Sequence, residues 1–411
     1  MEYIELGKIA EFVRGPFGGS LKKNIFVNDG IAVYEQQHAI YNQFDQIRYF
    51  IDENKFNEMK RFEVKPNDII MSCSGTMGKV AIVPKGVKKG IINQALLKIT
   101  PSSKLDSRFL EYYMKSTIFF EFLNADAKGA AIKNVASVKE LKKIPVMVIP
   151  LEEQRTIVAK LDQAFAAIDQ AKANIEKNIA NAKELFQSKL NQIFSEKGEG
   201  WVEVLFDDIY TDTLIGLIRS SKEQSSEKKY SYLKMDLISN SNQFLKKEMV
   251  KVDANNEEVK KYSLRDNDFL FNTRNSYELV GKTCVFKNYL NEIVLFNNNI
   301  MRVRFKSNYN SSFINYAFST IEIKEKLAIM KSGTTSVVGI YFKDLKNLKL
   351  TLPKSIETQQ KIVTQLDQLQ EQTNLLVTKY QQKLANLEEL KKSILEKAFK
   401  GELSTTVIEK V

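Results

Sequence analysis

Residues 151–197 read LEEQRTIVAKLDQAFAAIDQAKANIEKNIANAKELFQSKLNQIFSEK, and this stretch decides the fold. It contains neither proline nor glycine, and apolar residues recur along it with heptad spacing. A heptad pattern sustained over such a length predicts one long helix that pairs with another in a coiled coil. The residues expected in the seam between the helices are Val158, Leu161, Phe165, Ile168, Ile175, Ile179 and Phe186.

A second stretch of the same kind occupies residues 357–400. The segment IVAKLDQ at 157–163 returns there as IVTQLDQ at 362–368. Each helix should be about 60 Å long at 1.5 Å per residue, and antiparallel pairing of the two within one chain is expected. The alternative is that each packs as an ordinary amphipathic helix on its own domain. The expected seam residues of the second helix are Val363, Leu366, Val377, Tyr380, Leu384, Leu387 and Ile394.

The sequence is duplicated with a period of about 200 residues, which is too long for a solenoid repeat. The matched pairs are LGKIAEF (6–12) with LFDDIYT (205–211), PNDIIM (66–71) with DNDFLF (266–271), GKVAIV (78–83) with GKTCVF (281–286), Asn93-Gln94 with Asn298-Asn299, and VKELKKIPVMVIP (138–150) with FKDLKNLKLTLP (342–353). Chance would not place so many matches in register with the helices. We therefore predict a globular domain at 1–150, a spacer helix at 151–198, a second domain at 199–353, a second spacer helix at 354–403 and a tail at 404–411.

Each globular domain interleaves strand-like runs with one main helix, which predicts an α+β fold with a mostly antiparallel sheet. The runs expected as strands are 30–36, 68–72, 79–83 and 93–100 in the first domain, and 230–235, 269–271, 282–287 and 300–305 in the second. The main helices are expected at 106–122 and 312–330. The whole chain is then two α+β domains separated by an antiparallel coiled coil, with an internal pseudo-twofold repeat.

Charge is distributed unevenly along the chain, whose net charge is +11. Residues 1–150 carry +6 and residues 201–352 carry +5, whereas the helical segments 151–200 and 353–411 carry −1 and +1. Two basic bodies joined by neutral helices indicate a polyanion held at two places, and a generic basic protein with solvated lysines is the alternative.

The cellular location follows from what the sequence lacks. The two cysteines are far apart, which fits a reducing compartment. Residues 1–20 have no apolar signal-peptide core, and no apolar run approaches 18 residues. We therefore expect a cytoplasmic protein without a membrane span.

Catalytic motifs are also missing from the sequence. His38 is the only histidine, which excludes metal clusters built on several histidines. No G-x-x-x-x-G-K-[ST] loop occurs, and no two prolines are adjacent, so the Pro-Pro motif of amino-methyltransferases is absent. We expect no catalytic residues, no metal ligands and no cofactor on this chain.

Three groups of loop residues carry side chains suited to nucleic acid. Basic and hydroxyl groups beside small residues can donate to phosphates, and arginine or asparagine can read a guanine or an adenine edge. The groups are Arg14, Ser20, Lys22 and Lys23 beside Gly18-Gly19, with Arg219, Ser220 and Lys222 as counterpart; Ser74, Thr76 and Lys79, with Asn272, Arg274, Asn275 and Lys282; and Asn93 and Gln94, with Asn298 and Asn299. Gln37 and Lys234 are further candidates. The respective alternatives are a basic surface loop, hairpin turn chemistry, and a turn or an Asx cap.

Five segments together point to a known family. They are IPVMVIPLEEQRTIVAKLD (144–162), LKLTLPKSIETQQKIVTQLD (348–367), ILEKAFKGEL (394–403), GPFGGSLKK (15–23) and SGTMGKVAI (74–82). With them the chain resembles, over essentially its whole length, the specificity subunit of Type I restriction–modification systems. The second domain departs from the pattern, because it has LIGLIRSSKEQ (214–224) where the first has the GPFGGS loop. Only the region, and no residue role, is carried over there.

The resemblance implies a division of labour within a larger complex. Each globular domain would be a target recognition domain for one half of a bipartite double-stranded DNA site. The helices would set the spacing and dock two modification (methyltransferase) subunits, which bring S-adenosylmethionine. Restriction/translocase subunits would bring ATP and Mg²⁺, and this chain would be non-catalytic. The outer helix faces carry Leu185, Leu190, Leu375 and Leu395, so solubility without partners stays open.

Two other classes of protein compete with this interpretation. One is a coiled-coil scaffold whose basic domains bind proteins. The other is a free-standing DNA methyltransferase or nuclease, which the missing motifs disfavour.

Overall fold

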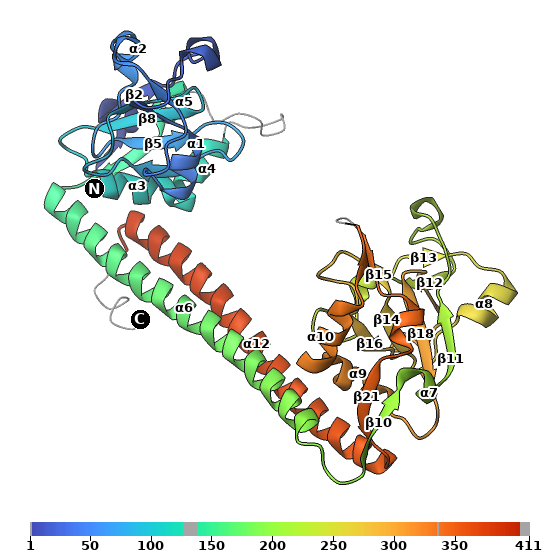
Figure 1. The fold of residues 1–411 in the computed structure, drawn as a ribbon. Coiled ribbons are helices and arrows are strands. Elements are labelled where there is room, and N and C mark those ends of the chain that lie inside the picture. The colour runs from blue at the N-terminus through green and yellow to red at the C-terminus, as the bar shows by residue number, and fades with distance from the viewer. Residues whose placement is uncertain (1, 126–137, 335–336, 403–411) are drawn as a thin grey trace. The chain divides into compact units, whose positions relative to one another are not determined.

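A computed structural model of the chain describes residues 2–125, 138–334 and 337–402. The chain divides into two units, one formed by Met1–Glu176 with Gln381–Val411 and the other by Lys177–Tyr380. Each unit holds one α+β domain together with parts of both long helices, α6 (Leu151–Ser195) and α12 (Ile356–Phe399) (Figure 1).

The domain of the first unit is built on two sheets. The larger is antiparallel, in the order β2 (Ala10–Arg14), β8 (Leu96–Pro101), β5 (Ile69–Ser72), β6 (Val80–Ile82). The smaller has the order β4 (Phe50–Ile51), β3 (Ile31–Tyr34), β7 (Gly90–Ile92), and β3 and β7 are parallel. β1 (Glu2–Glu5) pairs with β9 (Pro145–Val148) as a separate ribbon. The helices are α1 (Gln36–Tyr41), α2 (Glu53–Glu58), α3 (Ser107–Lys115), α4 (Thr117–Ala125) and α5 (Val138–Lys143).

The domain of the second unit repeats this plan. Its larger sheet has the order β11 (Tyr210–Ile215), β18 (Ile300–Phe305), β14 (Phe269–Asn272), β16 (Thr283–Val285). Its smaller sheet has the order β13 (Lys251–Val252), β12 (Tyr230–Leu233), β17 (Val294–Phe296), with β12 and β17 parallel. β10 (Trp201–Leu205) pairs with β21 (Lys349–Pro353), and β15 (Arg274–Asn275), β20 (Val338–Gly339) and β19 (Ser332–Gly333) form an additional sheet. The helices are α7 (Phe206–Ile209), α8 (Asn256–Tyr262), α9 (Ser311–Ser319), α10 (Ile321–Ile329) and α11 (Phe342–Leu345).

The central strands β5 and β14 read as continuous apolar runs because both of their faces are covered. Successive side chains of a strand point to opposite faces. Accordingly, Phe269 and Phe271 join one core cluster, whereas Leu270 joins another on the opposite face. All residues of both strands are buried.

The single helix predicted before each spacer region is two helices in the structure. Ser116 and Thr320 have extended backbone, with ψ of 154° at both, and so interrupt the helical run. The hydroxyl of Ser116 accepts from the Phe119 N–H at 3.3 Å, and that of Thr320 accepts from the Ile323 N–H at 3.3 Å. Each hydroxyl thereby caps the second helix. The apolar pattern continues across the break, so it could not reveal the cap.

The cap at Thr320 gives a direct prediction. Replacing Thr320 by alanine should lower the free energy of unfolding by about 1 kcal/mol, because the Ile323 N–H loses its acceptor. Trp201 is the only tryptophan, and its ring centroid lies 5.9 Å from that of Phe313. Its fluorescence therefore reports urea unfolding of this unit. Thr320→Ser, which keeps the hydroxyl, should retain most of the stability. An unchanged midpoint in the alanine variant would contradict the assignment.

The helices α6 and α12 pack together as an antiparallel coiled coil. In the first unit, Leu161 and Ile168 of α6 share a core with Ile394 of α12. In the second unit, Leu190 of α6 shares a core with Val363 of α12. The early part of one helix therefore lies beside the late part of the other. Polar pairs flank the seam: Lys172 pairs with Glu388, and Lys391 with Asp169 at 2.9 Å.

The predicted seam residues all lie away from solvent to some degree. Those that are buried are Val158, Leu161, Phe165, Ile168, Val363, Leu366 and Ile394. Those that are partly buried are Ile175, Ile179, Phe186, Val377, Tyr380, Leu384 and Leu387. Two of the leucines expected on outer faces, Leu190 and Leu395, are instead buried because the domains pack against the helices there. Leu185 and Leu375 are exposed.

Candidate functional site

One glycine follows the first strand of the larger sheet in each domain, Gly15 after β2 and Gly216 after β11, and it shows which residues of the two domains correspond. The N–H of Gly15 donates to Leu96 O at 2.9 Å, and the N–H of Gly216 donates to Ile300 O at 3.0 Å. A Cβ on Gly15 would lie 1.9 Å from Asn93 O, so no larger residue fits there. A Cβ on Gly216 would lie 2.3 Å from the equivalent carbonyl of Asn297. Gly15 and Gly216 are therefore equivalent.

This correspondence corrects one of the residue pairings made from the sequence. Arg14 lies one position before its glycine, where the second domain has Ile215, whereas Arg219 lies three positions after its glycine. The counterpart of Asn93 is Asn297, one residue earlier than predicted. Extra residues in the second domain between β14 and β18 hid the shift.

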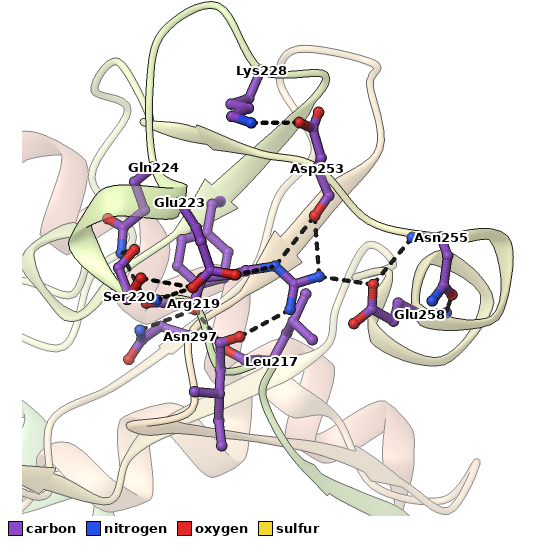
Figure 2. Close-up of polar contacts among 12 residues, drawn as sticks. Leu217, Arg219, Ser220, Glu223, Gln224, Lys228, Asp253, Asn255, Glu258 and Asn297 are labelled. Atoms are coloured by element: carbon purple, nitrogen blue, oxygen red, sulfur yellow. Dashed lines mark hydrogen bonds and ion pairs between the residues drawn. The ribbon is translucent and has the colours of Figure 1, made fainter.

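The first candidate group is mostly exposed. Arg14, Ser20, Lys22, Lys23, Ser220 and Lys222 are all exposed. Arg219 differs, because its side chain is only 15% exposed. Its guanidinium donates to Asp253 O at 3.2 and 3.1 Å, to Ile218 O at 2.9 Å and to Glu258 at 2.7 Å (Figure 2). The bond from Arg219 holds the pKa of Glu258 below its usual range. A DNA contact by Arg219 stays a prediction, but its charge is already compensated within the domain.

The second group lies in the connections β5–β6 and β14–β16. In the first domain Ser74, Thr76 and Lys79 are exposed, and Ser74 Oγ donates to Gln36 Oε1 at 2.9 Å, next to the exposed Gln37. The glycines that close these turns have φ of 76° at Gly78 and 89° at Gly281. The hairpin chemistry proposed as the alternative is thus present alongside the exposed side chains.

In the second domain one side chain of this group is exposed, whereas the others are buried, partly buried or hydrogen-bonded within the domain. Arg274 is exposed on β15, opposite Gly339. Asn272 is wholly buried, and neither of its amide atoms has a hydrogen-bond partner among the described residues. The structure therefore does not place Asn272 among the surface residues of this loop. Lys282 Nζ donates to Ile238 O at 2.6 Å, and burial lowers the pKa of Lys282. Asn275 and Lys234 are partly buried.

The third group begins with an Asx turn in each domain. Asn93 Oδ1 accepts from the Ala95 N–H at 3.0 Å, and Asn297 Oδ1 accepts from the Asn299 N–H at 2.9 Å. These asparagines shape the turn, as the alternative interpretation held. The next residues, Gln94 and Asn298, are exposed and partly exposed respectively. Their side-chain amides are accessible to solvent, fully or in part.

A buried glutamine near the start of each long helix was missed by the sequence analysis. Gln154 is fully buried; its Oε1 accepts from the Asp106 N–H at 2.8 Å. Its Nε2 donates to Lys104 O at 2.9 Å and to Ile149 O at 2.8 Å. All three bonds tie the helix to backbone of its own domain. We call this arrangement the glutamine clamp.

The second unit repeats the clamp with the same atoms. Gln359 is fully buried; its Oε1 accepts from the Asn310 N–H at 2.8 Å. Its Nε2 donates to Asn308 O at 3.2 Å and to Pro353 O at 2.9 Å. Gln154 and Gln359 each lie three residues before the matched segments IVAKLDQ and IVTQLDQ, and that match was the available signal.

A tyrosine–aspartate pair makes a second tie between each domain and its helix. The hydroxyl of Tyr112 donates to Asp162, and that of Tyr316 donates to Asp367 at 2.6 Å. Burial raises the pKa of both tyrosines, so both hydroxyls stay protonated donors. Arg108 also pairs with Asp162 in the first unit. Helix and domain are thus joined at the same two points in both units.

The described residues hold no cluster of three or more histidine, cysteine, aspartate or glutamate side chains able to bind a metal. None of their helices is both long and apolar enough to span a bilayer. Cys73 and Cys284 are buried and unpaired with each other.

Two copies of one α+β domain, each fixed to a long helix by the same ties and each carrying exposed polar loops, define an internally duplicated recognition protein. A family model described as the Type I restriction modification DNA specificity domain matches residues 1–181 and again residues 199–386. The chain therefore belongs to the Type I restriction–modification DNA specificity family. Its role is that of a specificity subunit in recognising DNA, and the scaffold alternative is not favoured.

Named relatives agree with this assignment. The specificity subunit of the Type I restriction enzyme EcoKI of Escherichia coli (strain K12) is 25% identical over 373 residues, which cover 86% of this chain and 78% of that protein. The StySPI specificity subunit of Salmonella potsdam is 24% identical over 400 residues, covering 93% and 84%.

Solved structures share the fold. The HsdS subunit from Thermoanaerobacter tengcongensis matches with a TM-score of 0.58 and 19% identity, over 98% of this chain and 97% of that one. A chain from a structure concerned with assembly and conformational transition of the type I R-M system matches with a TM-score of 0.76 and 18% identity, over 98% of both chains.

Proposed function

We propose that each globular domain reads one half of a two-part site in double-stranded DNA, while the helix pair sets the gap between the halves. The observation that carries this proposal is one fold used twice with different side chains at equivalent loop positions. Cys73 N donates to Ala95 O as Thr273 N donates to Asn299 O, so Ser74 and Arg274 are equivalent. An arginine can bind a guanine edge through two hydrogen bonds and a serine cannot, so the two half-sites should differ.

We further propose that the chain works without catalysis of its own. Two modification subunits would supply S-adenosylmethionine and the methyl transfer. Restriction/translocase subunits would supply ATP-driven translocation and cleavage with Mg²⁺. Exposed apolar side chains on the helices, such as Leu185 at 66% and Leu375 at 56%, suit a docking surface for such subunits. The complex would act in the cytoplasm, where the DNA is.

Selection from random duplexes tests the proposed function. The chain is combined with the modification subunits of its own system, and bound DNA is sequenced after repeated rounds. Two short defined blocks separated by a constant undefined gap are expected. Enrichment of no sequence, or of a single contiguous block, would overturn the proposal.

Arg274 gives the residue-level prediction. Replacing Arg274 by alanine should relax the preference at one or two positions of the second half-site only, at about 1–3 kcal/mol for a lost bidentate contact. The matched control is Arg265→Ala, which removes an exposed arginine outside this loop. Binding to a panel of single-base variants of the site measures the effect. An equal loss on every duplex would make Arg274 a phosphate contact instead.

A further inference from the structure

Each domain presents one large apolar side chain to solvent at the same place. Phe17 is 93% exposed and Ile218 is 72% exposed. Both lie two residues after the equivalent glycines Gly15 and Gly216. The intervening residues, Pro16 and Leu217, are buried in both domains. The chain therefore turns one apolar residue inward and the next one outward, in both copies.

Phe17 and Ile218 differ from ordinary exposed hydrophobic side chains because they occur at equivalent positions of the two domains. Single exposed apolar residues are common on protein surfaces and need no explanation. Tyr41 is such a case: it is 69% exposed, but its counterpart is Ser241, next to the equivalent left-handed residues Asn42 and Asn242. The exposed apolar side chain after the glycine is kept in both domains, although the loops that follow differ in length and sequence.

The backbone beneath each of these side chains is held in place. In the second domain Arg219 donates to Ile218 O, and the Tyr232 hydroxyl donates to Leu217 O at 2.5 Å (Figure 2). Asn297 Nδ2 in turn donates to the Tyr232 hydroxyl at 3.1 Å. The Arg219 side chain, itself bonded to Asp253 and Glu258, therefore supports the loop.

The first domain fixes the same position by other means. Pro16 restricts the backbone before Phe17, because its ring fixes φ. The Ser20 N–H donates to Phe17 O at 2.9 Å. Both side chains thus project from a fixed backbone, so little conformational entropy would be lost on contact with a ligand.

The surroundings favour DNA over a protein as the partner. Exposed Arg14 ends β2 just before the loop of Phe17, exposed Lys22 and Lys23 lie in that loop, and Lys222 lies in the loop of Ile218. The same glycines lie against the Asx turns that contain Gln94 and Asn298. A protein partner needs roughly 800 Å² of complementary surface on each side, far more than one side chain offers. A single phenylalanine or isoleucine is enough to contact a thymine methyl group or to enter between stacked base pairs.

We propose that Phe17 and Ile218 make the apolar contact of each domain with DNA bases, one in each half-site. The proposal rests on the proposed function, because it assumes that each domain reads its own half. Arg219 is then a positioning residue, which acts through the Ile218 carbonyl and not through DNA.

Substitution tests the proposal on the assembled complex. Phe17→Ala should weaken binding roughly tenfold through its own half-site and leave the other half unchanged, and Ile218→Ala should do the reverse. Phe17→Leu should restore much of the binding. Tyr41→Ala is the matched control and should bind as the unaltered chain does. Both wild-type side chains are exposed, so the thermal unfolding of the variants should also match that of the unaltered chain.

Modified DNA tests the same contact without altering the protein. Replacing each thymine of a half-site by uracil removes its methyl group, and 2-aminopurine fluorescence reports unstacking. A methyl contact predicts a loss of affinity at one uracil that disappears in Phe17→Ala. An inserted side chain predicts a fluorescence rise that disappears in the same variant. Either result supports the proposal.

Several outcomes would overturn it. The proposal fails if both alanine variants keep full affinity and preference, or if they lose affinity equally on all duplexes. It fails too if neither modified base responds. In each of these cases the unaltered chain would still select its two-part site, so the proposed function would stand. Failure of the unaltered chain to select any two-part site would refute the proposed function itself.

Discussion

Replacing Gln359 by alanine is expected to lower the free energy of unfolding of its unit by roughly 3 kcal/mol, because three backbone groups lose buried partners at once. Those groups are Asn310 N–H, Asn308 O and Pro353 O. Urea unfolding followed by Trp201 fluorescence measures the loss, since Trp201 lies in the same unit. Gln154→Ala should have a similar effect on the first unit, measured by hydrogen exchange of that unit.

Two further variants sharpen this prediction. Gln359→Glu keeps the acceptor and the size of the side chain but loses the donor, so it should be nearly as destabilising. Gln368→Ala alters an exposed glutamine of the same helix and should change stability by less than about 0.5 kcal/mol. If Gln359→Ala unfolds at the same urea concentration as Gln368→Ala, the clamp does not hold the helix.

Removing one heptad from each long helix should change the recognised gap and keep both half-sites. Residues 171–177 and 383–389 are suitable, because Lys172 and Glu388 pair within them. Seven residues correspond to about 10 Å of helix, or roughly 3 base pairs of DNA. A heptad leaves the seam in register, so the coiled coil should survive. Affinity for the original site should fall by roughly a thousandfold, toward the non-specific level.

The selection experiment described above measures the new gap. Deleting two residues from each helix, in place of seven, is the control, because it turns the rest of each helix by roughly half a turn and moves the apolar seam away from its partner. Recovery of the original gap from the heptad variant would show that the helices do not set the spacing.

The helix pair and the duplication could be predicted because both produce periodic patterns in the amino-acid sequence. Val158, Leu161 and Phe165 recur at positions that only a long helix brings onto one face. The α+β class followed from strand-like runs around one helical segment. The capped break at Thr320 could not be found in this way, because the apolar spacing of the two short helices runs on through it.

The candidate site was less predictable, because its contacts join residues distant in the sequence. Arg219 looks like a free cation in the sequence, but the fold places Asp253 and Glu258 beside it. Asn272 looks like a loop amide, but it ends a strand that is covered on both faces. Sequence similarity made Asn298 the counterpart of Asn93. The backbone hydrogen bonds of the sheets show that its counterpart is Asn297.

Exposure at equivalent positions is likewise a property of the fold. Phe17 and Ile218 share no sequence motif. They can be aligned only because Gly15 and Gly216 make equivalent backbone contacts in the two domains. The glutamine clamp differs, since Gln154 and Gln359 each lie three residues before the matched helix segments 157–163 and 362–368. Their role still required the backbone groups of the neighbouring loops to be placed in space.

The central claim is that each domain reads its own half of the site. Its most direct test replaces residues 202–353 by a second copy of residues 2–149, segments that correspond in strand register because Glu2 pairs with Val148 as Val202 pairs with Leu352. Selection from random duplexes by the resulting complex should then yield an inverted repeat of the first half-site, separated by a constant gap. Retention of the original asymmetric site by an assembled complex would contradict the claim.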